Sequence, residues 1–273
     1  MIQRLLITGA AGRLGTLLRE GLKPYAKSIR LSDIDALTEP ARDGEEFLRC
    51  DLADHEAVSH MVEGVSTIVH MGGAAYEQYF EPILRGNLIG IYNLYDAALA
   101  HGVKRIVLAS SNHVTGFYGT DEVVSTDMAA RPDSLYAASK SFAEMVSSFY
   151  FHRHGIETVC VRIGTCISRP KSQRCLATWL SHADFVELIR CALQADNVGH
   201  LVVYGVSNNP RKWWRDEAAE RLGYHPKDSA ADYADQIAPL SQNDAHNLWQ
   251  GGQVLGRDYR CGGKVPQDWK PDK

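Results

Sequence analysis

Tyr136 and Lys140 are the residues of this chain with the clearest capacity for chemistry. Among its twelve tyrosines, Tyr136 alone has a lysine four positions later. On a helix this spacing places the phenol and the ammonium on one face, a turn apart, so the ammonium can favour the phenolate. Ser111 precedes the pair and can hydrogen-bond a reacting hydroxyl and then the developing carbonyl. The three side chains together predict a site of proton and hydride transfer.

The phenol needs stabilisation of its anion before it can act as a base near neutral pH. Lowering its pKa from about 10 by roughly 3 units corresponds to about 4 kcal/mol. Lys140 is one source of this stabilisation, and the positive charge of an oxidised nicotinamide is the other. Lys140 can also hydrogen-bond a nicotinamide ribose. A surface pair on a helix is the alternative for Tyr136 and Lys140, and the order of glycine turn, Ser111 and Tyr136 argues against it.

A glycine-rich turn at residues 8–15 follows a short apolar run and opens an amphipathic segment. In the context of strand, turn and helix, such a turn lets the backbone approach a pyrophosphate, and the helix N-terminus offers N–H donors. A turn that only packs strand against helix is the alternative. The residues expected at the pyrophosphate are Gly9, Gly12, Arg13, Leu14 and Gly15.

Asp33 ends the second predicted strand, roughly 20 residues past the glycine turn, where a carboxylate can accept both ribose hydroxyls and repel a 2′-phosphate. Asp33 could instead only form a turn, and Arg13 could hold a 2′-phosphate. Because the carboxylate would oppose the phosphate, we expect NAD rather than NADP. Asn87 is as compatible with a helix surface as with bracing the site. The remaining cofactor contacts expected are Ile34, Asp51, Leu52, Met71, Gly72, Gly73, Asn87 and Ile163.

Short apolar runs alternate with longer amphipathic stretches, a pattern that predicts repeated strand–helix–strand units. Strands are expected at residues 4–8, 29–32, 46–50, 67–71, 105–110, 157–163 and 200–204, and helices at 14–22, 55–63, 82–101, 136–154, 183–195 and 212–222. The strands are rich in Leu, Ile and Val, as in a parallel sheet covered on both faces. The predicted fold class is α/β, a Rossmann-type doubly wound parallel sheet with a small C-terminal substrate lobe.

We expect one domain over residues 1–273. Residues 1–205 are mainly the dinucleotide-binding core, and about 165–180 and 206–273 form the substrate lobe and an extended tail with Gly262, Gly263, Pro266 and Pro271.

Composition narrows the possible functions. The net charge is −4 with both signs spread along the chain, which gives no basic footprint for nucleic acid or a membrane surface. The six cysteines form no C-x-x-C pair and no Cys/His cluster with zinc spacing, so we expect no metal and a reducing compartment. No secretory signal and no apolar run of about 18 residues is present, which predicts a cytoplasmic protein.

The chain resembles the extended short-chain dehydrogenase/reductase superfamily in the glycine turn, Asp33, Asp51-Leu52, Ser110-Ser111 and Tyr136 through Lys140. More narrowly, it is similar to the NAD-dependent uronate dehydrogenases along essentially its whole length. The segments that carry this likeness are residues 4–12, 50–54, 89–95, 109–113 and 162–164, Trp213-Trp214, and Gln250-Gly251-Gly252. The Asn112-His113 pair after the serine is more specific than the superfamily motifs.

The resemblance implies oxidation of galacturonate or glucuronate at C1 to an aldarolactone, with Tyr136 as the base and NAD as the hydride acceptor. Asn112 and His113 would bind sugar hydroxyls, and Arg174 would hold the substrate carboxylate, a task that suits a guanidinium fork. The residues alone make Arg174 one loop arginine among many. Ala75 and Thr165 depart from serines usual in the family, which leaves substrate preference open. The resemblance also implies a homo-oligomer.

Two other functions compete with this interpretation. A nucleotide-sugar epimerase or dehydratase shares the superfamily motifs, but it needs a larger substrate lobe, and a dehydratase needs an acid where Asn112 follows Ser111. A dinucleotide-sensing protein would not need both Tyr136 and Lys140. Tightly bound NAD with turnover of a nucleotide sugar would favour the epimerase, and function retained without the Tyr136 hydroxyl would favour the sensor.

Overall fold

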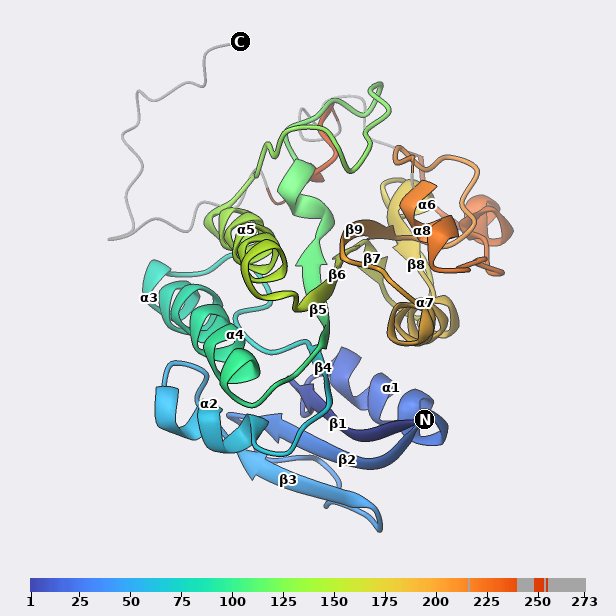
Figure 1. The fold of residues 1–273 in the computed structure, drawn as a ribbon. Coiled ribbons are helices and arrows are strands. Elements are labelled where there is room, and N and C mark those ends of the chain that lie inside the picture. The colour runs from blue at the N-terminus through green and yellow to red at the C-terminus, as the bar shows by residue number, and fades with distance from the viewer. Residues whose placement is uncertain (216, 240–247, 253, 255–273) are drawn as a thin grey trace.

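A seven-stranded sheet with strand order β3-β2-β1-β4-β5-β6-β9 forms the centre of the computed structural model (Figure 1). The structure describes residues 1–215, 217–239, 248–252 and 254. All adjacent strands of this sheet pair in parallel. The strands are β1 (Ile2–Thr8), β2 (Ala26–Asp33), β3 (Glu45–Arg49), β4 (Thr67–His70), β5 (Arg105–Ser111), β6 (Glu157–Ile163) and β9 (His200–Gly205).

Helices cover both faces of the sheet, as a fully parallel sheet requires. On one face, α1 (Arg13–Leu22) packs beside α7 (His182–Gln194). On the other face, α2 (His55–Val62), α4 (Gly90–Ala100) and α5 (Leu135–His154) lie side by side (Figure 1). Each face has its own apolar core, so the strands are buried from both sides. These observations confirm the predicted fold class.

All seven predicted strands are present, and most of the predicted helices begin and end near their expected residues. The helix predicted at residues 82–101 is instead a short α3 (Phe80–Ile83), a π-helical segment η2 (Leu84–Ile89) and α4. The prediction of a helix from residue 212 is wrong. Trp214 forms a bridge with Val124, and its ring stacks on Tyr204, whereas α8 spans only Glu217–Arg221. Burial of the indole overrides the helical pattern there.

Short elements gather beyond the carboxyl ends of the central strands. They are η3 (Asn112–Thr115), the two-stranded parallel pair β7 (Thr165–Cys166) and β8 (Trp179–Leu180), α6 (Cys175–Thr178) and η4 (Ala230–Gln236); η1 (Lys23–Tyr25) lies between α1 and β2. The pair β7–β8 and α6 were not predicted, because two- and four-residue elements carry almost no periodicity. The extended tail predicted around residues 262–271 lies outside the described residues.

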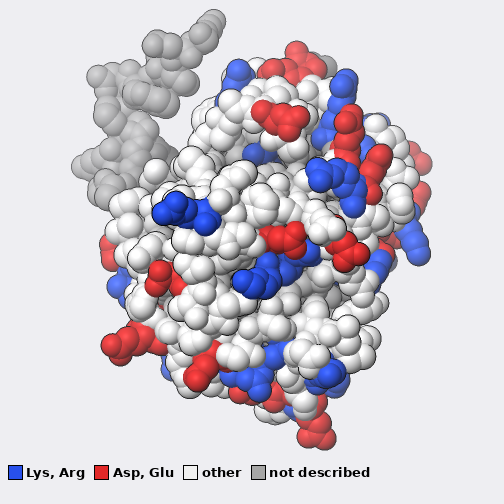
Figure 2. Space-filling model, in the orientation of Figure 1, with Lys and Arg blue, Asp and Glu red and all other residues white. Residues whose placement is uncertain are grey.

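The visible surface carries basic and acidic side chains interspersed among neutral residues, rather than a single field of one sign (Figure 2). Within the described part of the chain, none of the helices is long and apolar enough to cross a membrane.

Candidate active site

Two adjoining cavities lie along the carboxyl ends of the central strands, with volumes of about 570 and 780 Å³. They share Gly9, Gly12 and residues 71–76, so they form one continuous groove. The groove lies over the point between β1 and β4 where the strand order reverses, the usual place for a ligand in an open α/β sheet.

The groove brings together nearly all the residues predicted for the site. The first cavity is lined by Gly9, Gly12, Arg13, Leu14, Gly15, Met71, Gly72, Gly73, Ala75, Ser111, Asn112, His113, Tyr136, Lys140, Ile163, Thr165 and Arg174. The second is lined by Asp33, Ile34, Asp51 and Leu52 together with part of the same glycine-rich wall. Among the predicted residues, Asn87 alone is absent from both linings.

The glycine turn brings backbone against backbone. Gly9 has a φ of +67°, and a Cβ there would lie 2.6 Å from the Met71 carbonyl. A Cβ on Gly15 would collide with the Gly9 carbonyl, so this glycine lets α1 pack against the turn. Gly12 is the N-cap of α1 and has no side chain to accept from the first N–H groups of the helix. Packing and anion binding therefore use the same glycines, and the uncapped helix end lies at the cavity.

The Asp33 side chain is held in place by backbone N–H groups of the glycine turn and of its own turn. Its carboxylate accepts hydrogen bonds from the backbone N–H groups of Ala11, at 2.9 Å, and Asp35, at 3.2 Å. The turn-forming role considered from the sequence is therefore real, and it fixes the carboxylate at the edge of the second cavity. Arg13 lines the first cavity and Asp33 lines the second.

Tyr136 and Lys140 occupy the first two turns of α5. The N-terminus of this helix is fixed by Ser134, whose Oγ accepts from Ala137 N, and by Glu77, whose carboxylate accepts from Tyr136 N at 2.7 Å. Lys140 is buried, and its Nζ lies 5.7 Å from the centre of the Tyr136 ring. The helix thus holds the side chains of Tyr136 and Lys140 side by side, and both line the first cavity, as predicted.

Burial sets the titration of this pair. It raises the pKa of Tyr136 to about 12. The hydrogen bond from Ser111 lowers this pKa, and the charge of Asp133 raises it further. Burial lowers the pKa of Lys140 to about 8. The protein alone therefore makes the phenol a weaker acid than free tyrosine, contrary to the expectation that Lys140 brings it toward neutrality. Reaching a pKa of about 7 requires roughly 5 units, or about 7 kcal/mol.

Arg174 lines the first cavity, and its hydrogen bonding is incomplete. Its Nε donates to the Gln250 carbonyl at 2.7 Å, and one terminal nitrogen donates to Thr165 Oγ1 at 3.2 Å. The other terminal nitrogen is buried and has no hydrogen-bond partner among the described residues. Burial lowers the pKa of this guanidinium, so the protein pays a desolvation cost for a cation at the cavity wall. A carboxylate in the cavity would compensate that charge.

His113 projects from η3, which begins directly after Ser111. The Oγ of Ser111 caps this short helix and accepts a hydrogen bond from His113 N. Its Nδ1 lies 2.6 Å from Asp133 Oδ2, and the Asp133 side chain is fully buried. If Nδ1 carries the proton, the pair leaves Nε2 as an acceptor for a sugar hydroxyl.

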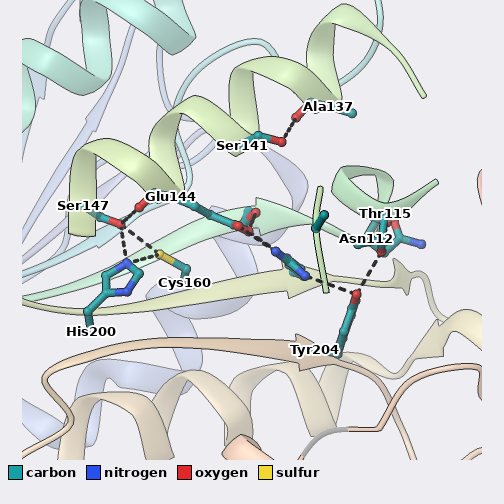
Figure 3. Close-up of polar contacts among 12 residues, drawn as sticks. Asn112, Thr115, Ala137, Ser141, Glu144, Ser147, Cys160, His200 and Tyr204 are labelled. Atoms are coloured by element: carbon teal, nitrogen blue, oxygen red, sulfur yellow. Dashed lines mark hydrogen bonds and ion pairs between the residues drawn. The ribbon is translucent and has the colours of Figure 1, made fainter. Parts of the chain in front are cut away.

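A buried polar network holds the end of β5 beneath these residues (Figure 3). Ser110 and Arg162 both donate to the Glu144 carboxylate from two neighbouring strands. Tyr204 continues the network, because its hydroxyl lies 3.3 Å from Arg162 and 2.9 Å from Thr115 Oγ1. Thr115 in turn donates to the Asn112 carbonyl, so the network reaches the loop that carries the predicted sugar contacts.

Several residues of the site were missed or underrated from the sequence. Asn87 is buried in η2, where it bonds the Ala74 backbone and Ser139 Oγ, so it braces the cavity wall from behind. Glu77, Asp133 and Gln250 touch site residues from distant parts of the chain, and no local spacing could have identified them. Among the described residues, no group of three His, Cys, Asp or Glu side chains gathers as a metal site.

Comparisons with known proteins agree with this geometry. The profile of the NAD dependent epimerase/dehydratase family matches residues 5–213. A uronate dehydrogenase from Pseudomonas syringae pv. tomato is 48% identical over 255 residues, 92% of this chain and 93% of that protein. A uronate dehydrogenase from Agrobacterium fabrum is 48% identical over 258 residues, 93% and 97% of the two chains.

The fold and length also match solved structures. A uronate dehydrogenase from Agrobacterium tumefaciens, solved as a mutant in complex with NAD, superposes with a TM-score of 0.92 at 46% identity and covers 95% of this chain and 99% of that one. The superfamily motifs, the strand order and these relatives agree along nearly the whole chain. The chain belongs to the NAD dependent epimerase/dehydratase family, in the group that contains the uronate dehydrogenases.

Proposed function

We propose that this protein is an NAD-dependent dehydrogenase that oxidises a hexuronate, galacturonate or glucuronate, at C1 to the aldarolactone. The observation that carries the proposal is the first cavity, in which Arg174, one terminal nitrogen of which has no hydrogen-bond partner among the described residues, shares a wall with Tyr136, Lys140 and Ser111. A carboxylate-binding group beside a proton-transfer group suits a sugar acid. The relatives that match nearly the whole chain are uronate dehydrogenases.

The groove fits a dinucleotide along its length. The close backbone approach at Gly9 and the uncapped start of α1 suit a pyrophosphate, and the carboxylate of Asp33 suits the hydroxyls of a ribose. We assign the adenosine half to the second cavity, beside Ile34, Asp51 and Leu52. The nicotinamide half belongs in the first cavity, toward Lys140 and Ile163. When bound, oxidised nicotinamide supplies the hydride acceptor and a positive charge near the phenol.

The residues of the chain then divide the work. Arg174 binds the substrate carboxylate, and His113 and Asn112 bind sugar hydroxyls, so that the C1 hydroxyl lies at Tyr136. Ser111 donates to the C1 oxygen and stays bonded as that oxygen becomes a carbonyl. Tyr136, as the phenolate, takes the C1 hydroxyl proton while the C1–H bond breaks with its electron pair. Lys140 stabilises the phenolate and orients the nicotinamide ribose. The oxidised product keeps its ring and is the lactone.

Asp33 sets the choice of cofactor in this proposal. Replacing Asp33 with asparagine removes the negative charge that opposes a 2′-phosphate and weakens the bonds to the ribose. Loss of one charge-assisted hydrogen bond costs about 1.5–3 kcal/mol, so the preference for NAD over NADP should fall by about 10- to 100-fold. The ratio of kcat/KM for the two cofactors measures this. Asp43→Asn, which changes an exposed aspartate outside both cavities, is the matched control, and an unchanged ratio in Asp33→Asn would remove Asp33 from cofactor selection.

The pH dependence of turnover tests the role of Lys140. Because the phenolate is the base, the oxidation rate should rise with pH until Tyr136 is fully ionised. Below its pKa of about 8, Lys140 carries a positive charge, and two unit charges about 6 Å apart interact by roughly 3 kcal/mol at an effective dielectric constant of about 20, equal to about 2 pKa units. Lys140→Met should therefore move the ascending limb of kcat at saturating NAD to higher pH by about 1–2 units. Lys140→Arg keeps the charge and should restore most of the shift, whereas a limb that stays in place in Lys140→Met contradicts the electrostatic role.

A nucleotide-sugar dehydratase or epimerase remains the nearest competing function. A dehydratase requires an acid beside the reacting carbon, and among the described residues the first cavity is lined by no aspartate or glutamate. Glu144, on α5 beside the end of β5, is committed to Ser110 and Arg162. The product decides between the functions. With galacturonate labelled with ¹³C at C1 and with NAD, the NMR signal should move from the anomeric to the lactone carbonyl region, whereas inversion at C4 would identify an epimerase.

We further propose that residues 165–180 and 206–239 act as the substrate lobe on the dinucleotide-binding part of a single domain, in a cytoplasmic homo-oligomer. The cysteines at positions 50, 160, 166, 175 and 191 are free and buried, which suits a reducing compartment. Exposed apolar side chains on the packed pair α4 and α5, namely Tyr92, Met145 and Phe149, suit a contact between copies of the chain. The mass of the protein in solution tests the assembly.

A further inference from the structure

Residues 250–252, here the 250–252 turn, reach the substrate side of the site from the far end of the described chain. The turn is joined to the loop after η3 by backbone hydrogen bonds. Gln250 N donates to the Tyr118 carbonyl and Gly251 N to the Gly116 carbonyl, each at 2.9 Å. Figure 1 shows this red segment beside the green loop. The turn is therefore attached to the same loop region that carries His113.

The Gln250 side chain anchors the turn inside the protein. It is 1% exposed, and its amide is fully used. Its Oε1 accepts from Trp214 Nε1 at 2.9 Å, and its Nε2 donates to the carbonyls of Gly119, at 3.0 Å, and Glu122, at 2.9 Å. A buried amide with all these bonds satisfied has one stable orientation. The backbone of residue 250 is thereby held in one place.

That backbone contacts two residues of the substrate site. The Gln250 carbonyl accepts from Arg174 Nε. Gly252 has a φ of +60°, and a Cβ there would lie 2.7 Å from Arg174 Cδ. A Cβ on Gly251 would collide with the Asp133 carboxylate, the partner of His113. The turn thus packs against both Arg174 and Asp133, and only glycine leaves room for these approaches.

We propose that the 250–252 turn is a positioning element that sets substrate affinity through Arg174 and, by way of Asp133, through His113. This inference rests on the proposed function, because it assigns Arg174 and His113 to the substrate. The backbone contacts of the 250–252 turn are with Arg174, Asp133 and the loop after η3, and none of these contacts involves Tyr136 or Lys140. Disturbance of the turn should therefore weaken uronate binding while leaving NAD binding intact.

Gly252→Ala is the most direct test. The added methyl group displaces Arg174 and should raise KM for the uronate by about 10- to 100-fold, the usual cost of a misplacement of about 1 Å. The dissociation constant for NAD should stay within about 2-fold. Gly102→Ala is the matched control, because Gly102 has a φ of +74° with nothing within 4 Å of its Cβ position. It carries the same backbone strain without touching the site, so its KM should match the wild type.

A double-mutant cycle separates positioning from general damage. In an Arg174→Met background, the added effect of Gly252→Ala on kcat/KM should largely disappear, because the turn acts through that guanidinium. Gln250→Ala should reproduce the rise in KM through loss of the anchor. Equal KM values for Gly252→Ala and Gly102→Ala, or additive effects in the cycle, would overturn the inference while leaving the proposed function intact. Absence of uronate turnover by the wild-type protein would instead overturn the proposed function, and this inference with it.

Discussion

Replacement of Tyr136 by phenylalanine is expected to lower kcat for uronate oxidation by about 10²- to 10⁴-fold, the usual contribution of general base catalysis. The substitution removes one oxygen and keeps the ring that packs in the cavity. In this account Ser111 is a hydrogen-bond donor to the C1 oxygen and Lys140 is the cation beside the phenol, so neither replaces the lost hydroxyl. Initial rates at saturating NAD and uronate measure the effect.

Binding of NAD should survive this substitution, because the glycine turn and Asp33 are untouched. Titration of the cofactor by calorimetry should give a dissociation constant within about 2-fold of the wild type. Tyr150→Phe is the matched control, as it removes a hydroxyl from the same helix about four turns further on, and should leave turnover unchanged. If Tyr136→Phe kept most of the activity, the phenol would not be the base, and the dinucleotide-sensing alternative would gain support.

Replacement of Arg174 by methionine is expected to lower kcat/KM for the uronate by about 10²- to 10⁴-fold. A guanidinium–carboxylate pair makes two charge-assisted hydrogen bonds, each of about 1.5–3 kcal/mol. Methionine keeps much of the aliphatic stem that packs against Gly252, so the loss reports the charge and the donors. The preference for galacturonate over galactose should fall by a similar factor, which initial rates with both sugars measure.

Two further variants sharpen the Arg174 test. Arg174→Lys keeps the charge but presents a single point donor, so its kcat/KM should lie between those of wild type and Arg174→Met. Arg169→Met removes an exposed arginine from the same segment and should leave kcat/KM unchanged. A normal preference for uronate over neutral sugar in Arg174→Met would show that another group binds the carboxylate.

The predictable parts of the fold are the elements that leave a local pattern of apolar residues in the sequence. The strands were recognisable because buried parallel strands consist of continuous apolar runs. The prediction of a helix from residue 212 was wrong because the Trp214 side chain packs on Tyr204 and donates a hydrogen bond to Gln250. Such a contact outweighs the weak intrinsic preference of a few residues for helix.

The candidate site divides in the same way. The glycine turn, Asp33 and the Tyr136–Lys140 spacing are local signals, and the structure places all of them on one groove. Only the family resemblance pointed to Arg174, because its spacing from other residues carries no signal. In the structure, the terminal nitrogen that has no hydrogen-bond partner among the described residues gives a physical reason to place a ligand there. Asp133 and Gln250 act through contacts between distant segments, which sequence periodicity does not encode. The raised pKa of Tyr136 likewise depends on burial by several elements at once.

The formation of NADH by the purified protein tests the central claim most directly. Galacturonate, glucuronate, galactose and glucose would each be supplied with NAD and, separately, with NADP. We predict turnover of the uronates with NAD, and little or none of the neutral sugars or with NADP, because Arg174 binds the carboxylate and Asp33 opposes the 2′-phosphate. Turnover of the neutral sugars as fast as the uronates, or no reduction of NAD with any of the four, would contradict the account.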